Sequence, residues 1–177
     1  MINHNILFED VLNRTMSVKL ADTDYSANFM EGDLFELWRV LQKSEQKYPI
    51  IWLQSGYKVT KNTINGSRIT FDRLDFFLIT KGDTNDYNEK RYRTTFNDML
   101  YVLEVLLVDT FKKAKGFTLP EDYESSSFPF NEINEPSKSG MKLKPQTATT
   151  PVIWDAVALS FDGLSIVSDC YPEYKIK

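Results

Sequence analysis

The clearest hydrophobic pattern in the chain is a stripe at helical spacing between residues 87 and 115. Apolar positions recur there every three or four residues, as on one face of an amphipathic helix. Acids precede the stripe, lysines close it and Gly116 follows it, which complements the helix dipole and marks a stop. We therefore predict one long helix over residues 87–115. Its stripe consists of Phe96, Met99, Leu100, Leu103, Leu106, Leu107 and Phe111.

Two shorter helices are predicted before the long one. Residues 3–20 carry apolar side chains near helical spacing, and the polar residues 21–30 indicate a loop. Asp33 has the side chain of an N-cap, and Lys43 and Lys47 suit the negative end of the helix that it would begin. The apolar faces are Ile6, Leu7, Val11, Leu12 and Met16 in the first helix, and Leu34, Leu37, Trp38 and Leu41 in the second.

Two strands are predicted between the second helix and the long one. Tyr48-Pro49 ends the helix, because a residue before proline avoids the α region, and the apolar run at residues 50–53 indicates a buried strand that Gly56 ends. Residues 58–65 are polar and indicate a loop with a turn at Asn65-Gly66. Residues 68–80 alternate as a strand does, but the alternation slips at residue 73. A β-bulge near residues 72–73 would keep the apolar side chains on one face.

The last predicted element is a β-hairpin. Residues 151–171 contain two apolar stretches joined at Asp162-Gly163, and an Asp-Gly pair between apolar stretches is a strong hairpin signal. Trp154 in this hairpin and Trp52 in the earlier strand are expected to pack in the core. Alternatively, both tryptophans lie on a second sheet face that meets another subunit.

Residues 117–150 have little periodicity and are rich in proline and serine. A connection of this length is usually functional or mobile. Because it also carries aromatic residues such as Tyr123 and Phe128, we expect an arm that lies along a surface, either its own domain's or a neighbour's. We expect the domain to fold without residues 120–145 but to assemble poorly.

Taken together, these elements predict a single α+β domain over residues 1–177. It would have an antiparallel sheet of about four strands, with the long helix and the N-terminal helices packed on one face. A chain of 177 residues buries roughly 70% of its unfolded surface, so it can form a core without disulfides or a bound metal ion.

Composition narrows the possible functions. The net charge of −4 gives no general attraction for a nucleic-acid backbone, and the local cations Lys90, Arg91 and Arg93 are better read as a solvated helix face. Hence we expect no direct nucleic-acid binding. The chain has one cysteine, so it cannot form an internal disulfide. We also expect no secretory signal and no membrane span, since no apolar run is long enough.

No residue pattern indicates chemistry. His4 and Cys170 are the only residues of their kinds, and neither has a partner in sequence that would activate it. The acids Asp22 and Asp24, and Asp83 and Asp86, lack the spacing of a calcium-binding loop. Phosphate-binding glycine loops and the Gly-x-Ser-x-Gly motif are absent. We therefore expect no catalytic residue, no cofactor and no metal site.

The order of elements carries a resemblance. A helix leads into Tyr48-Pro49 and a short strand, a second strand leads into the long helix with Phe96 to Leu100, and the chain closes on strands from Trp154. This order resembles the small α+β proteins of tailed-phage necks and tails, the tail-terminator or tail-completion group. The resemblance covers most of the chain except residues 117–150, and it rests on patterns of residue type.

The resemblance implies a non-enzymatic structural subunit that forms a ring in the neck or at the head-proximal end of the tail. Its partners would be copies of itself and neighbouring neck or tail proteins. The subunit would belong to the virion and assemble in the cytoplasm of the bacterial host. The alternative is a small bacterial adaptor or binding protein of similar fold without a phage role, and an enzyme of unfamiliar type is the third class.

Overall fold

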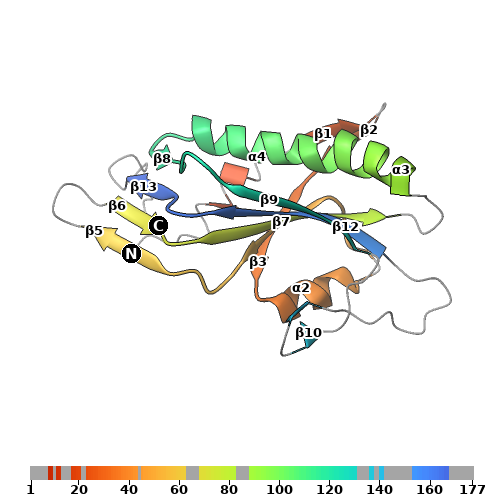
Figure 1. The fold of residues 1–177 in the computed structure, drawn as a ribbon, viewed down its shortest axis with the longest axis horizontal. Coiled ribbons are helices and arrows are strands. Elements are labelled where there is room, and N and C mark those ends of the chain that lie inside the picture. The colour runs from red at the N-terminus through yellow and green to blue at the C-terminus, as the bar shows by residue number, and fades with distance from the viewer. Residues whose placement is uncertain are drawn as a thin grey trace, which may run out of the picture.

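The computed structural model describes residues 8–9, 11–12, 17–20, 23–43, 45–62, 68–82, 88–130, 136–137, 140–141 and 153–167. Within them the chain is α+β, as the sequence predicts, with two larger β-sheets and one long helical segment (Figure 1). The details differ from the expected arrangement, because the strands divide between two sheets and the helices lie on two faces.

The larger sheet has five strands in the order β3-β4-β7-β12-β9. Strands β3 and β4 are parallel, and the other neighbours are antiparallel, so the expected all-antiparallel sheet of about four strands is corrected. Strand β4, which lies between β3 and β7, confirms the buried strand predicted after Tyr48-Pro49. The five strands span Asn28–Gly32 (β3), Ile50–Gln54 (β4), Leu74–Gly82 (β7), Ile153–Phe161 (β12) and Glu124–Phe130 (β9).

The second sheet has four antiparallel strands in the order β5-β6-β13-β8. Its strand β5 lies where the sequence indicated a polar loop, because a solvent-facing edge strand carries few apolar residues. The predicted turn at residues 65–66 lies outside the described residues. The strands span Val59–Asn62 (β5), Arg68–Phe71 (β6), Ser165–Val167 (β13) and Phe117–Thr118 (β8).

The chain passes between the two sheets at two adjacent corners. Asp72 and Arg73 separate β6 from β7, so this point is a change of sheet and not the predicted bulge. Strands β12 and β13 likewise belong to different sheets, so the predicted hairpin is wrong although its turn residue Gly163 has the expected positive φ of 83°. The corners are hydrogen-bonded to each other: the Gly163 N–H donates to the Phe71 carbonyl (3.1 Å), and the Phe71 N–H donates to the Leu164 carbonyl (2.9 Å).

The predicted long helix is a continuous helical segment of three parts on one face of the five-stranded sheet (Figure 1). The parts are α3 (Asn88–Arg91), the π-helical η1 (Tyr92–Leu100) and α4 (Tyr101–Lys113). Thr94 donates its hydroxyl to the Lys90 carbonyl (2.9 Å), a local bond of the kind that distorts helices. Of the predicted stripe, every residue is buried except Leu106, which is half-buried. Gly116 has a φ of 87°, three residues beyond the helix end.

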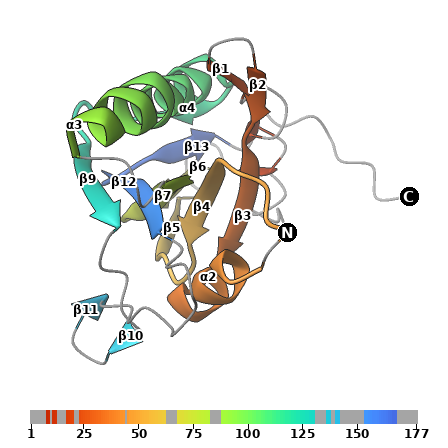
Figure 2. The ribbon, with the colours of Figure 1, turned by 90° about the vertical axis from the view of Figure 1, so that its right-hand side faces the viewer.

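Helix α2 (Leu34–Leu41) lies on the opposite face of the sheet (Figure 2), so the expectation of all helices on one face is wrong. Asp33 is its N-cap, as predicted, and forms a capping box with Glu36. The side chains of successive residues in a strand point to opposite faces, so the apolar run of β4 buries Trp52 under α2 and Leu53 under the long helix. Lys43 and Lys47 lie beyond the end of this helix.

The N-terminal segment is only partly helical. Phe8, Glu9, Val11 and Leu12 have helical backbone, and β1 (Ser17–Leu20) pairs with β2 (Thr23–Ser26) where the sequence indicated the end of a helix and a loop. The fully buried Phe8 was missing from the predicted apolar face. Ile6, Leu7 and Met16, which were in it, lie outside the described residues.

The main core is continuous across both sheets and the long helical segment. Its centre is a cluster of phenylalanine rings around Phe111, with centroids 5.6–6.1 Å from those of four neighbouring rings. Each fully buried Phe side chain contributes about 1.5–3 kcal/mol to folding, so this cluster determines how the layers stack. The four neighbours are Phe8, Phe76, Phe117 and Phe161.

Part of the predicted arm belongs to these sheets. Residues 117–118 form β8, and β9 (Glu124–Phe130) is the outer strand of the five-stranded sheet beside β12. Farther along, β10 (Pro136–Ser137) pairs with β11 (Gly140–Met141). Over residues 117–130 the arm therefore lies on its own domain.

Candidate interaction surface

Strand β9 is attached to the domain by side chains as well as by its backbone. Tyr123 donates its hydroxyl to Glu104 on α4 (3.1 Å), and the Tyr101 and Ser127 hydroxyls are 2.7 Å apart. Tyr101 and Glu104 are three residues apart, so they share one flank of the helix. The Tyr123 ring also stacks on Phe161 with centroids 5.2 Å apart. Burial, and then the nearby Glu104 charge, raise the pKa of Tyr123, which keeps its hydroxyl a donor.

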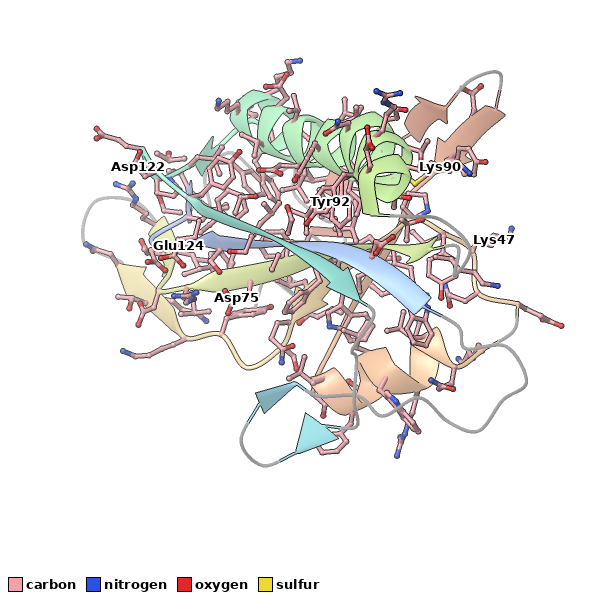
Figure 3. The ribbon with its side chains drawn as sticks, turned by 45° about the vertical axis from the view of Figure 1, so that its right-hand side comes forward. Lys47, Asp75, Lys90, Tyr92, Asp122 and Glu124 are labelled. Atoms are coloured by element: carbon pink, nitrogen blue, oxygen red, sulfur yellow. The ribbon has the colours of Figure 1, made fainter. Side chains whose placement is uncertain are left out.

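A polar cluster holds the other face of β9, near the two corners. Arg73 contacts Asp75 (Nε to Oδ1, 3.0 Å), Ser160 (2.9 Å) and Glu124 (3.4 Å), which come from β7, β12 and β9 in turn. Figure 3 shows Asp75 and Glu124 at the same end of the sheet. Because the arginine is half-exposed, each ion pair adds little stability, and the cluster mainly fixes the position of the strand's start.

The outer strand at the other side, β3, is held by close packing. A Cβ atom on Gly32 would overlap the Glu36 carboxylate and lie 2.8 Å from the Trp52 ring, so only glycine fits without movement. Tyr57 donates its hydroxyl to Glu31 Oε1 (3.3 Å). Burial raises the pKa of Glu31, and the Tyr57 hydrogen bond offsets part of that rise.

The backbone bonds of β3 show which groups face outward. The Asn28 N–H donates to the Pro49 carbonyl (3.0 Å), and the Ser55 N–H donates to the Gly32 carbonyl (2.9 Å). Backbone groups alternate in direction along a strand, so residues 28, 30 and 32 point toward β4. The N–H and C=O groups of Phe29 and Glu31 therefore point away from the sheet.

The same alternation applies to β9. Pro129 lacks an N–H, and proline in a sheet is found where its nitrogen faces away from the ladder. Pro129 is paired with Asp155 of β12, so the outward set is Pro129, Ser127 and Ser125. The handedness of L-residues gives the same result. Strands β3 and β9 run in opposite directions on opposite edges of the sheet. Residues on the helix-facing side, such as Phe29 in β3 and Ser127 in β9, therefore both direct their N–H and C=O groups outward.

The structure describes only some of the residues that the sequence singles out as candidates for chemistry or binding. His4, Cys170, Asp22, Asp83 and Asp86 are outside the described residues. Of the predicted surface cations, Lys90 and Arg93 are exposed, and Figure 3 shows Lys90, a residue of α3, at the end of the molecule remote from Asp122 and Glu124. Trp52 and Trp154 are buried beneath α2, so their core role is confirmed.

Searches for other kinds of site give negative findings for the described residues. Those residues hold no group of three or more His, Cys, Asp or Glu side chains placed to bind a metal ion. Within the same part of the chain, no helix has both the length and the hydropathy needed to cross a bilayer.

Comparison with known proteins gives no family. The sequence matches no protein-family model, and no curated protein is significantly similar to it.

Sequence reasoning missed both edge strands. The segment of β9 is rich in serine and β3 mixes polar and apolar residues, so neither has the alternation that indicates a strand. One signal was present: a proline among β-branched or aromatic residues demotes a strand to an edge, and Pro129 between Phe128 and Phe130 has that form.

Proposed function

We propose that this chain is a non-enzymatic structural subunit of a tailed-phage or prophage particle, which forms a ring in the neck or at the head-proximal end of the tail. One observation carries the proposal: the five-stranded sheet ends in two different strands, β3 and β9, on opposite sides. The resemblance in element order adds to it. A subunit with two unlike edges is suited to repeated head-to-tail contact.

Symmetry explains why unlike edges matter. A contact between two different surfaces of identical subunits is heterologous, and it closes into a ring when the rotation between neighbours permits. Copies of the chain are therefore its first partners, and neighbouring neck or tail proteins are the next. In this role the protein acts by contact, without membrane or direct nucleic-acid binding, and it assembles in the host cytoplasm before it becomes part of the virion.

The polar groups at the edges support a structural role. Tyr123, Glu104 and Arg73 use their hydrogen bonds to attach β9. A catalytic role would require a nucleophile or base held against a substrate-sized space by a third group. The contacts of these three residues instead join secondary-structure elements to one another.

The test is disruption of the gene in its phage or prophage, followed by electron microscopy of the induced particles. We expect separate heads and tails, or tails of irregular length, and restoration when the intact gene is supplied from a plasmid. Complete, infectious particles that lack the protein would overturn the proposal. The adaptor without a phage role would then be the better hypothesis.

A further inference from the structure

We propose that the outer face of the four-stranded sheet binds a tetrahedral oxyanion, such as phosphate or sulfate, at the guanidinium group of Arg68. This sheet lies at one end of the molecule (Figure 1), and the site does not depend on the proposed function. Three observations carry the inference. They are a row of hydroxyl groups across the sheet, an arginine held on that row by a buried serine, and the absence of acids from the four strands.

One hydroxyl-bearing residue from each strand lies in a single row across the sheet. Ser165 of β13 is directly opposite Thr70 of β6 on one side and Thr118 of β8 on the other. Thr60 of β5 continues the row, because it is opposite Thr70. Residues opposite each other in a ladder share a face, with Cβ atoms about 4.5–5.5 Å apart. Ile166, the neighbour of Ser165, points into the main core, so the hydroxyl row points away from the core.

Arg68 is held on this row by the Ser165 hydroxyl. Its Nε and Nη2 atoms donate to Ser165 Oγ over 3.1 and 2.8 Å. Ser165 is only 1% exposed, whereas the arginine is exposed. A buried acceptor therefore fixes one edge of an exposed guanidinium between Thr70 and Thr118, the two residues that flank Ser165. Because the guanidinium is planar, its remaining N–H groups point away from Ser165.

The charge around Arg68 favours an anion. Strands β5, β6, β13 and β8 contain no aspartate or glutamate, although the whole chain has a net charge of −4. Asp72, just beyond β6, is four residues from Arg68 and hence about 13 Å away along the strand. Its carboxylate is paired with Lys58 (3.0 Å). Unlike Arg73, which pairs with Asp75, Arg68 has no acidic partner in the described part of the chain.

The geometry favours a tetrahedral anion over a carboxylate. A carboxylate binds arginine best through two parallel hydrogen bonds in one plane. Ser165 occupies the Nε–Nη2 edge, so only the end of the guanidinium is left for such a pair. Phosphate and sulfate have oxygens in several directions and can accept from these N–H groups and from the Thr70 and Thr118 hydroxyls together. Ser165 is then a positioning residue, and the other three bind the ligand.

Titration of the full-length, isotope-labelled protein with inorganic phosphate, followed by two-dimensional NMR, tests the site. Chloride is used to keep the ionic strength constant. We expect saturable shifts with a Kd on the order of millimolar, because a few charge-assisted hydrogen bonds at an exposed site give weak affinity. The shifting amides should lie in β6, β13 and β8. Sulfate should bind similarly, and acetate more weakly than either.

Arg68→Gln removes the charge and keeps a polar side chain at this exposed position. We expect phosphate binding to weaken by about tenfold or more, the usual effect of losing hydrogen bonds to a charged group. The matched control is Lys61→Gln. Because Lys61 is opposite Ile69, it removes one positive charge from the other face of the same sheet. The control should change the Kd by less than about twofold, since salt screens exposed charges.

Two further variants separate the roles of charge and geometry. Thr70→Val with Thr118→Val removes the flanking hydroxyls and keeps Arg68, and it should weaken phosphate binding by about threefold or more. Arg68→Lys keeps the charge but loses the planar fork, so its affinity should lie between those of the unmodified protein and Arg68→Gln. Circular dichroism checks that each variant is folded. If Arg68→Gln is unfolded, Arg68→Lys decides the question.

The alternative is that Arg68 only joins β6 to β13 by its hydrogen bonds to Ser165. In that case Arg68→Gln lowers stability, but the unmodified protein shows no saturable shift with phosphate or sulfate, and the site is rejected. Shifts centred on other elements, or equal phosphate binding by Arg68→Gln, would reject it as well. Acetate binding as tightly as phosphate would overturn the assignment to a tetrahedral anion.

Discussion

The two outer strands of the five-stranded sheet are held by different forces. Strand β9 is mostly exposed at its start and is attached by the hydroxyls of Tyr123 and Ser127 and by the ion pair of Glu124 with Arg73. Strand β3 is half-buried, and its end packs so closely that Gly32 has no room for a side chain.

The difference shows that the two outer strands of one sheet can be held in place by different interactions. Directional hydrogen bonds position β9, and close packing positions β3. Substitutions should therefore weaken β9 through lost polar contacts and β3 through overlap. The predictions below test that contrast, beginning with the largest effect.

Deletion of residues 120–145 should abolish cooperative folding, contrary to the expectation from sequence. The deletion removes β9, so one side of the β12 backbone loses its partner strand and the Phe161 ring loses its stacking partner Tyr123. Thermal unfolding followed by circular dichroism would show no sharp transition. Deletion of residues 131–145 alone keeps β9 and serves as the control. A normal transition in the longer deletion would show that β9 is dispensable.

Gly32→Ala should destabilise the β3 edge by about 1–3 kcal/mol, the usual cost of overpacking. The added methyl group overlaps the Trp52 ring and the Glu36 carboxylate, and the first of these is fixed in the core beneath α2. Urea unfolding measures the change. Asp24→Ala, at an exposed position on the neighbouring β2, should change stability by less than about 0.5 kcal/mol. No measurable effect at Gly32 would contradict the packing account of β3.

Tyr123→Phe should cost about 1 kcal/mol, the typical net value of one hydrogen bond. The ring keeps its stacking on Phe161, but Glu104 loses the hydroxyl that donates to it. Ser125→Ala is the matched control on the same strand, at an exposed residue. If both variants unfold at the same urea concentration as the unmodified protein, hydrogen bonding does not hold β9.

Glu31→Gln should give the smallest change, and one that depends on pH. Burial raises the pKa of Glu31 in the folded state above its ordinary value of 4.5. The folded protein therefore loses stability when Glu31 ionises, that is, as the pH rises through the folded pKa. Glutamine does not ionise. The variant's advantage should be present at neutral pH and shrink below about pH 4.5. Urea midpoints across this range measure it, and a difference independent of pH would contradict the assignment.

The elements that sequence analysis found are those whose pattern comes from burial. Leu53 and Ile51 on β4, the stripe around Phe111, and the cap at Asp33 were all readable because each faces the core or ends a helix. The edge strands were not readable, since their backbone pairs on one side only and their residues need not be apolar. The candidate interaction surface consists of the edge strands β3 and β9, so it could not be predicted from the sequence for the same reason.

The π-helical turn η1 is another feature without a sequence signal. Residues 92–100 contain no proline or glycine to announce a distortion, and Phe96, Met99 and Leu100 fit an ordinary helix equally well.

By itself, the sequence determined the α+β class, the long helix, the capped helix before Tyr48-Pro49 and the turn at Gly163, because each depends on local backbone preference or on periodic burial. Only the tertiary structure decided that this turn joins two sheets and that Ser125 and Glu31 end the same sheet on opposite sides. Strand pairing joins residues that are far apart in the chain, and it does so through backbone groups that every residue has. The pattern of side chains therefore does not show which strands pair with each other.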